Sequence, residues 1–179
     1  MEIKRVGILG AGVMGAQIAA HLTNANIPVY AFDMSQDVAE KGVQAAMKIK
    51  PAAFYNPKNS EMITPLNYDD HIDKLKECDW IIEVIAEKIE WKHQLYERIA
   101  SHVNPNTILT SNTSGLSAAT LVEKMDSSLK KRFFITHFFN PPRYMKLVEI
   151  VTHADTDMSL IKPMADFLEN VLGKGVVYA

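Results

Sequence analysis

The sequence has little cysteine, no long apolar run and no strong excess of either charge. Its 179 residues include one cysteine, Cys78, and carry a formal net charge of -2. A single cysteine cannot form a disulfide within the chain, which excludes the small disulfide-stapled folds. No stretch reaches the ~18 consecutive apolar residues of a membrane-spanning helix, and Lys and Arg are scattered rather than gathered in a basic stripe. These absences argue against membrane and nucleic-acid partners and favour a small-molecule ligand.

The cysteine count also bears on the cellular compartment. No charged leader with an apolar core precedes the first apolar segment, so we expect a protein of the reducing cytoplasm. Cys78 stands just before an apolar segment, and buried free cysteine commonly acts as a small apolar residue. We therefore expect Cys78 to take no part in the chemistry.

Apolar segments alternate with helical patterns along the whole chain. Hydrophobic residues make up 47% of the sequence, enough for one core in a chain of this length. The alternation predicts one α/β domain over residues 1–179, with a doubly wound, mostly parallel sheet and helices on both faces, as in Rossmann domains. The predicted strands cover residues 4–9, 29–32, 80–84, 107–110, 133–137, 147–151 and 176–178. The predicted helices cover residues 14–24, 37–49, 88–103, 117–125 and 158–172.

Two features interrupt this alternation. Residues 50–70, KPAAFYNPKNSEMITPLNYDD, contain three prolines and three asparagines without a steady period, which predicts a surface excursion with little regular structure. Pro163 lies early in the last predicted helix. Because proline lacks an N–H and clashes with the preceding turn, it should bend that helix or delay its start.

The segment VGILGAGVMGAQIA places Gly10, Gly12 and Gly15 between the first predicted strand and the first predicted helix. This G-x-G-x-x-G spacing is weak on its own, but its position after a strand and at a helix start fits a dinucleotide site. Gly10 permits the tight turn, Gly12 a close approach of a pyrophosphate, and Gly15 close packing of helix on strand. The candidate contacts at this helix N-terminus are Gly10, Ala11, Gly12, Val13, Met14 and Gly15.

Asp33 ends the second predicted strand, 23 residues after Gly10. In dinucleotide sites a carboxylate ~20 residues after the glycine turn accepts hydrogen bonds from the adenosine ribose. An NADP site would favour an arginine here for the 2′-phosphate, and the nearest basic residue downstream is Lys41. The sequence therefore favours NAD over NADP. An aspartate that caps the following helix stays open as the alternative.

A nicotinamide cofactor carries the hydride, so the protein must supply an acid or base, and histidine suits neutral pH. His137 closes the apolar segment RFFITHFF, and ligands of open α/β sheets lie at the carboxyl ends of strands. Asn140 follows it, before two prolines. Glu149 lies in the apolar segment KLVEIV, where a carboxylate needs a partner such as an imidazolium. Two side chains that face water separately remain the alternative. Ordinary surface or partly buried positions are expected for the other five histidines, His21, His71, His93, His102 and His153.

Two more polar groups fall at the same predicted edge of the sheet. TSNTSGLS, residues 110–117, follows a strand and begins a helix, and helix capping by Ser114 or Ser117 explains part of it. Glu83 and Glu87 end or follow another strand, with Lys92 beyond. A charged helix start is the simplest interpretation of these residues.

Together, GILGAGVMGAQIA, DWIIEVIAEKIEWK, SNTSGLS and HFFNPPRYMKLVEIV resemble the NAD-binding domain of the L-3-hydroxyacyl-CoA dehydrogenases, over about residues 3–177. The resemblance implies NAD-dependent oxidation of L-3-hydroxyacyl-CoA to 3-oxoacyl-CoA in fatty-acid β-oxidation. It implies that His137 is the base that removes the proton of the 3-hydroxyl and that Glu149 orients and stabilises the imidazolium. Further roles follow for Ser114 on the substrate oxygen, for Asn140 at the nicotinamide and the reacting carbonyl, and for Glu87 and Lys92 at the nicotinamide end of NAD.

The resemblance also implies a larger protein. Family members continue into a helical second domain that forms much of a homodimer interface and part of the substrate site, whereas this chain ends at LGKGVVYA. We therefore expect an excised domain that binds NAD but has little or no activity alone. Residues 50–65 are unlike the helical pair of the short dehydrogenases and more similar to long bacterial fusions with an enoyl-CoA hydratase module. Lysines on that pair contact CoA in the short enzymes, which makes Lys48 and Lys50 candidate ligands of the acyl-CoA substrate.

Two other functions stay open from the sequence. A relative with the same first domain would act on a free hydroxy acid or sugar acid. A non-catalytic NAD-binding module would have lost the reaction altogether. The presence of both His137 and Glu149 argues against the second, because nothing structural requires the pair.

Overall fold

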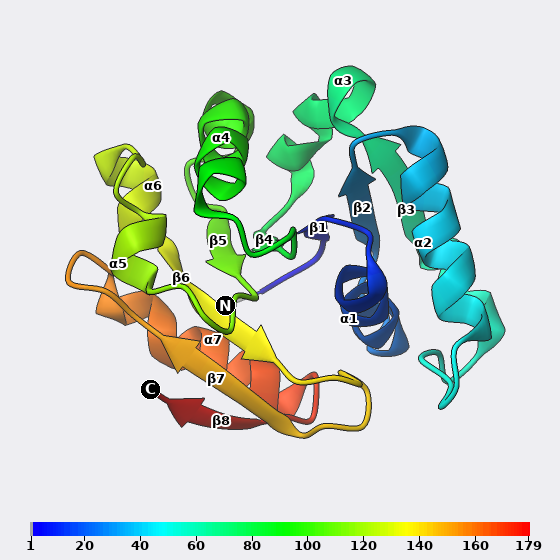
Figure 1. Ribbon diagram of the computed structural model, residues 1–179. Helices are drawn as coiled ribbons and strands as arrows, with labels where there is room; N and C mark the ends of the chain where they lie inside the picture. Colours follow the sequence, from blue (N-terminus) through cyan, green and yellow to red (C-terminus); the bar gives the residue numbers. More distant parts are fainter. Residues whose placement is uncertain (1) are drawn as a thin grey trace.

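Eight strands form one sheet in the computed structural model, which describes residues 2–179 (Figure 1). The strands are β1 (Val6–Leu9), β2 (Val29–Asp33), β3 (Ile63–Asn67), β4 (Trp80–Glu83), β5 (Ile108–Ser111), β6 (Phe133–Phe138), β7 (Leu147–Val151) and β8 (Gly175–Tyr178). Their order across the sheet is β3-β2-β1-β4-β5-β6-β7-β8. Only the β6–β7 pair is antiparallel among these neighbours. The predicted α/β class and mostly parallel sheet are confirmed.

Helices cover both faces of this sheet (Figure 1). The α-helices are α1 (Val13–Asn24), α2 (Gln36–Lys48), α3 (Tyr68–His71), α4 (Ile89–Ile99), α5 (Ala118–Leu121), α6 (Ser127–Lys131) and α7 (Ile161–Asn170). The apolar side chains of α1, α2 and α7 join one buried cluster, and those of α3 to α6 join a second. The two clusters lie on opposite faces of the sheet, which gives three layers and a doubly wound fold.

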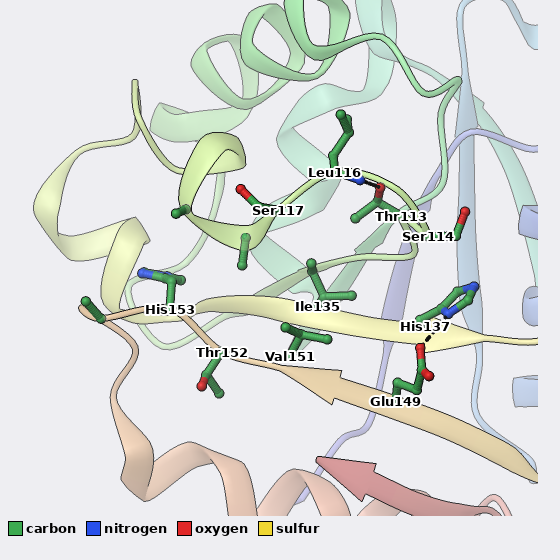
Figure 2. Close-up of a pocket in the computed structure, with 13 residues that line it drawn as sticks. Thr113, Ser114, Leu116, Ser117, Ile135, His137, Glu149, Val151, Thr152 and His153 are labelled. Carbon is green, nitrogen blue, oxygen red and sulfur yellow. Dashed lines mark hydrogen bonds and ion pairs between the residues drawn. The ribbon is translucent and has the colours of Figure 1, made fainter. Parts of the chain in front are cut away.

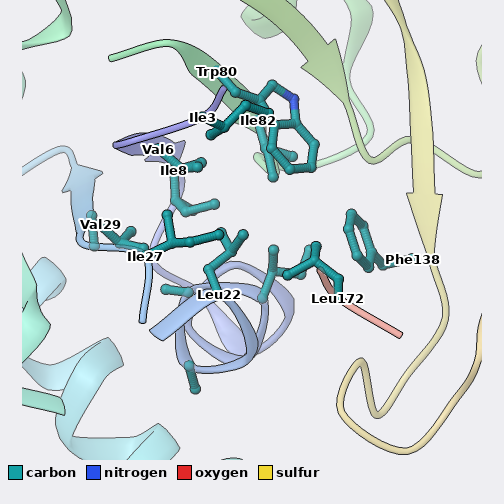
Figure 3. Packing of buried hydrophobic residues seen from close by; sticks show 14 of the residues in the cluster. Ile3, Val6, Ile8, Leu22, Ile27, Val29, Trp80, Ile82, Phe138 and Leu172 are labelled. Atoms are coloured by element: carbon teal, nitrogen blue, oxygen red, sulfur yellow. The ribbon is translucent and has the colours of Figure 1, made fainter. Parts of the chain in front are cut away.

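The first cluster contains Trp80, the largest of the fully buried side chains (Figure 3). Its indole Nε1 donates to Thr110 Oγ1 at 2.9 Å, so the one polar atom of the ring is satisfied. Phe138 and Phe167 pack against the ring with centroid distances of 6.4 and 5.9 Å. This packing joins β4, β6 and α7, and so holds the end of β6 in place next to its neighbours.

The chain reverses direction across the sheet at β1. The path moves outward through β2 and β3, then returns to the other side of β1 with β4. Ligands of open α/β sheets bind outside the carboxyl ends of the strands at such a point. The carboxyl ends of β1, β2, β4 and β5 carry the glycine turn, Asp33, Glu83 and Ser111. The topology therefore brings four polar segments of the sequence to one edge.

Residues 50–70 are more regular than predicted, and the expectation of little regular structure is wrong. They contain a 3-10 helix (Pro57–Met62), all of β3 and the start of α3. Pro65 lies within β3, which is possible because β3 is an edge strand and an edge tolerates a missing N–H. Asn24 holds the loop before the 3-10 helix, since its Oδ1 accepts from Tyr55 N at 2.8 Å and its Nδ2 donates to Ala53 O at 2.9 Å.

The helix predicted over residues 117–125 is much shorter in the structure. Ser117 caps α5 by accepting from Thr120 N, but α5 ends at Leu121. The side chain of Asp126 then accepts from two backbone N–H groups and starts α6, a helix that the sequence analysis missed. The expected effect of Pro163 is confirmed, because a 3-10 turn precedes α7 and the α-helix begins only at Ile161.

Candidate functional site

The glycine turn between β1 and α1 leaves room for a ligand at one of its three glycines. Gly10 has a φ of +107°, which L side chains rarely adopt, and a Cβ at Gly15 would lie 1.8 Å from the Gly10 carbonyl oxygen. The fold itself therefore requires both glycines. A Cβ at Gly12 would meet nothing within 4 Å. The open space above Gly12, at the N-terminus of α1, fits a pyrophosphate that approaches the backbone.

Asp33 ties the glycine turn to the end of β2. Its Oδ2 accepts from Ala11 N at 2.8 Å and its Oδ1 accepts from Met34 N at 2.7 Å. The cap of α2 is Ser35, whose side chain accepts from Val38 N. The interpretation of Asp33 as a helix cap is therefore wrong. Its carboxylate lines the large cleft beside the turn, where a ribose would lie.

Three neighbouring pockets run from the glycine turn to β7. The first, of about 840 Å³, is the cleft beside Gly12 and Asp33. The second, of about 310 Å³, shares Val84 and Ile85 with the first and reaches His137. The third, also of about 310 Å³, shares Thr113, Ser114 and His137 with the second. Its apolar lining includes Leu116, Ala118, Ile135 and Val151. His137 thus lines two pockets, one that shares residues with the cleft beside the glycine turn and one that is also lined by Glu149 and Val151.

His137 and Glu149 are directly opposite each other in the antiparallel β6–β7 pair. His137 Nδ1 lies 2.9 Å from Glu149 Oε2, and Figure 2 shows the two side chains pointing toward one another. A proton on Nδ1, donated to the carboxylate, leaves Nε2 as an acceptor. The contact excludes the alternative in which the two residues face water separately. The pair can therefore accept a proton at Nε2 and stabilise the resulting imidazolium.

The remaining candidates of the nicotinamide side line the second pocket together with His137. Glu87, Lys92, Ser114 and Asn140 all contribute to its wall. Glu87 Oε1 accepts from Ser114 N at 3.0 Å, and the Asn140 carbonyl Oδ1 accepts from Gln17 Nε2 at 3.4 Å. The structure therefore brings together four residues that lie in three separate segments of the sequence.

Glu83 and Lys92 are buried, and their interpretation as part of a charged helix start is wrong. Glu83 is 0% exposed and Lys92 1% exposed, and Glu83 Oε1 lies 2.7 Å from Lys92 Nζ. Lys92 Nζ is also 3.7 Å from Glu87 Oε2. Glu83 was not among the predicted residues of the site. The available signal was an acidic residue that closes the otherwise apolar strand WIIE.

Lys48 and Lys50 lie apart from these pockets. Lys48 is the last residue of α2 and Lys50 follows it. Both side chains are exposed, and neither lines any of the three pockets. The structure does not bring them together with His137.

Two of the remaining histidines are more buried than expected. His21 is 6% and His93 8% exposed, so the interpretation as surface or partly buried residues is wrong for them. His93 Nε2 lies 2.9 Å from Thr120 O, which satisfies one ring nitrogen and links α4 to α5. Both side chains are therefore packed within the domain, and neither lines any of the three pockets.

None of the helices within residues 2–179 combines the length and apolar character needed to cross a membrane. Within the same residues, no group of three or more His, Cys, Asp or Glu side chains is arranged to hold a metal ion.

Comparisons with known proteins agree with this geometry. The family model described as 3-hydroxyacyl-CoA dehydrogenase, NAD binding domain, matches residues 5–179. A probable 3-hydroxyacyl-CoA dehydrogenase of Deinococcus radiodurans is 41% identical over 186 residues, which cover 100% of this chain and 54% of that protein. One of Bacillus subtilis is 42% identical over 199 residues, which cover 99% of this chain and 25% of that protein. The chain therefore spans about half or less of these relatives.

A solved structure shares the arrangement of the elements. The (S)-3-hydroxybutyryl-CoA dehydrogenase PaaH1 of Ralstonia eutropha superposes with a TM-score of 0.83 at 28% sequence identity. The match covers 99% of this chain and 63% of that one. The eight-stranded sheet and its helices are thus similar to those of a dehydrogenase of known structure.

Proposed function

The chain belongs to the 3-hydroxyacyl-CoA dehydrogenase family, as its NAD-binding domain, and from this premise we propose that the protein oxidises L-3-hydroxyacyl-CoA to 3-oxoacyl-CoA with NAD in fatty-acid β-oxidation. One observation carries the proposal most directly, namely the His137–Glu149 contact at the wall shared by two pockets. A base placed there reaches a substrate on one side and a cofactor on the other.

The proton of the substrate hydroxyl goes to His137 Nε2. Glu149 holds the Nδ1–H, fixes the tautomer and stabilises the imidazolium that forms. When bound, NAD accepts the hydride that leaves C3 of the substrate. The Ser114 hydroxyl and the Asn140 amide line the same pocket, where they orient the substrate oxygen and the nicotinamide.

The glycine turn and Asp33 hold the adenosine half of the cofactor in this proposal. The open space over Gly12 takes the pyrophosphate, and the half-buried Asp33 carboxylate accepts from the ribose. A 2′-phosphate would meet this carboxylate, and Lys41 is engaged by Asp37 at 2.7 Å. Both observations support NAD rather than NADP. Glu87 and Lys92 contact the nicotinamide end.

For the whole protein we also propose a homodimeric assembly and contacts of Lys48 and Lys50 with CoA, both from the resemblance to the family. The single cysteine supports the further proposal of a cytoplasmic location. The exposed position of both lysines leaves them accessible to a phosphate group. Loss of affinity for acyl-CoA, but not for free NADH, in a Lys48→Ala/Lys50→Ala variant would support the lysine contacts.

The test of the proposed function is an assay of NADH formation by the whole protein that carries this domain. We expect turnover with L-3-hydroxybutyryl-CoA and NAD, and little with the D enantiomer, the free hydroxy acid or NADP. The 179-residue chain alone should bind NADH without turnover. Preference for a free hydroxy or sugar acid would contradict the substrate class, and absence of all turnover with intact NADH binding would indicate a non-catalytic module.

A further inference from the structure

Glu83 is a carboxylate without exposed surface at the end of β4. Burial of an ionised carboxylate is costly unless donors replace the lost water. Glu83 Oε1 accepts from Ile85 N and Lys92 Nζ, each at 2.7 Å. Glu83 Oε2 accepts from Tyr96 OH at 2.7 Å and Ser111 Oγ at 2.6 Å. All four contacts come from donors, as an ionised carboxylate requires.

Tyr96 is a permanent donor in this cluster. Burial, with the Glu83 carboxylate beside it, raises the pKa of the Tyr96 hydroxyl well above its usual value. The hydroxyl therefore keeps its proton and its hydrogen bond to Glu83 Oε2. This contact joins α4 to β4, which fixes Lys92 and Tyr96 on the same helix relative to the sheet.

The contacts of Glu83 are part of a closed ring of ion pairs and hydrogen bonds, one of which comes from the backbone N–H of Thr113. Lys92 Nζ, which contacts Glu83, also lies 3.7 Å from Glu87 Oε2, and Glu87 accepts from Thr113 Oγ1 at 2.8 Å. Thr113 N donates to Ser111 Oγ at 3.3 Å, and the Ser111 hydroxyl donates to Glu83 Oε2. The ring crosses from β4 through α4 to the loop after β5. The position of each member thus depends on the others.

The ring forms one wall of the pocket that contains His137. Glu87, Lys92 and Thr113 line this pocket, whereas Glu83 does not. Glu87 also accepts from the backbone N–H of Ser114, which lies in the same wall. Glu83 therefore acts on the pocket through its neighbours and not by contact with a ligand.

We infer that Glu83 is a positioning residue for the nicotinamide end of the dinucleotide, because it fixes the Lys92 ammonium and, through Ser111 and Thr113, the wall formed by Glu87 and Ser114. The inference rests on the proposed function, which places the nicotinamide in this pocket. A purely structural role would change the stability of the domain and the affinity for every part of the dinucleotide alike.

The test compares NADH with ADP-ribose, which has the adenosine, pyrophosphate and second ribose but no nicotinamide. Calorimetry on the 179-residue chain should show that Glu83→Gln weakens NADH binding by about tenfold, the order expected for a lost charge-assisted contact. ADP-ribose affinity should change less than about twofold. The enhancement of NADH fluorescence on binding should also fall. Equal losses for the two ligands, or no loss for either, would overturn the inference.

Ser111→Ala provides a second variant, because Glu83→Gln changes a fully buried position and can prevent folding. It cuts the ring at an uncharged link and leaves the Glu83–Lys92 pair in place. We expect the same selective loss of NADH affinity, at smaller size. Thr110→Val is the matched control, since the Thr110 hydroxyl is also buried and hydrogen-bonded but contacts Trp80 and Thr136 instead of the ring.

The outcomes separate this inference from the proposed function. Wild-type chain that binds neither NADH nor ADP-ribose would overturn both. Wild-type chain that binds both ligands, together with a Ser111→Ala variant that binds NADH as tightly as the Thr110→Val control does, would overturn the role of Glu83 alone. Selective loss of NADH affinity in Ser111→Ala supports it even where Glu83→Gln does not fold.

Discussion

Gly42, in the middle of α2, lies against the carbonyl oxygen of Ala11 in the glycine turn. A Cβ at Gly42 would fall 1.9 Å from that oxygen. The backbone N–H of Ala11 itself donates to Asp33 Oδ2 at 2.8 Å. The turn that is proposed to approach the cofactor is therefore held by β2 and by α2 together.

Replacement of Gly42 by alanine should destabilise the domain. In an ordinary helix interior, alanine is more favourable than glycine by roughly 0.5–1 kcal/mol. Here the added methyl would overlap a backbone oxygen, and the forced shift should cost about 1–3 kcal/mol. The measurement is the free energy of unfolding from denaturant titration. Ala45→Gly, at an exposed position of the same helix, gives the ordinary effect of helix propensity for comparison. A Gly42→Ala variant more stable than the wild type would contradict the contact.

Gly12→Ala should have the opposite combination of effects. Its φ of -69° is accessible to alanine, and the added Cβ would meet no protein atom within 4 Å. The free energy of unfolding should therefore fall by no more than about 1 kcal/mol, the size of the preference for glycine over alanine at the N-cap of α1. NADH affinity should fall by at least about tenfold, because the methyl would occupy the proposed pyrophosphate position. Unchanged affinity in calorimetry would show that the ligand does not approach Gly12.

The sequence predicted the order of strands and helices because the apolar patterns that mark them are local. Strand β3 was missed since its partner β2 is more than a helix away in sequence and Pro65 interrupts its pattern. The close packing of Gly42 on Ala11 was also invisible, because it depends on which segments become neighbours in space.

In the candidate site too, local patterns could be predicted, whereas contacts between distant segments could not. His137 and Glu149 could be paired from the sequence because a carboxylate in an apolar strand requires a partner. Their register then places them opposite each other. Glu83 was not assigned to the site, since its partners Tyr96 and Ser111 come from two other elements. Nothing near Glu83 in the sequence indicates that these hydroxyls surround it.

Cys78 should be unreactive in the folded protein. Burial raises the pKa of the Cys78 thiol to about 12, and the thiolate is the reactive form. We expect almost no reaction with an aromatic disulfide reagent under native conditions at neutral pH. In denaturant the same thiol should react at the rate of a free cysteine. Rapid modification of the native protein would show that this part of the domain opens or that the thiol is accessible.

His21 should make the domain less stable as the pH falls below about 6.5. Burial, with smaller effects of the Lys174 and Arg143 charges, lowers the pKa of His21 from 6.5 to about 4. Its Nδ1 is buried and has no hydrogen-bond partner among residues 2–179, so an added proton there would be unpaired. Between pH 6.5 and 4 the unfolded chain therefore binds more protons at this site than the folded chain. The contribution of His21 to stability is complete above pH 6.5 and declines as the pH falls toward 4.

The stability that the domain loses through His21 is set by the shift in its pKa, and this loss should be about 3 kcal/mol near pH 4. His21→Gln removes the titration while its amide keeps a donor for Leu172 O, the partner of His21 Nε2. The measurement is the free energy of unfolding of both proteins at several pH values between 7 and 4. The variant should lose less stability than the wild type over this range. Parallel pH dependences would contradict the proposed origin.

His137→Gln in the whole protein should separate turnover from cofactor binding. The side chain lies at the boundary of two pockets and is separate from the glycine turn, so NADH affinity should stay within about twofold. Loss of the base should lower kcat by roughly 10²–10⁴-fold. Glu149→Gln should also reduce kcat, because its amide can donate to Nδ1 and so favour the tautomer with the proton on Nε2, where it cannot accept the substrate proton. Comparable losses of turnover and NADH affinity in both variants would instead indicate that His137 and Glu149 maintain the structure of the pocket.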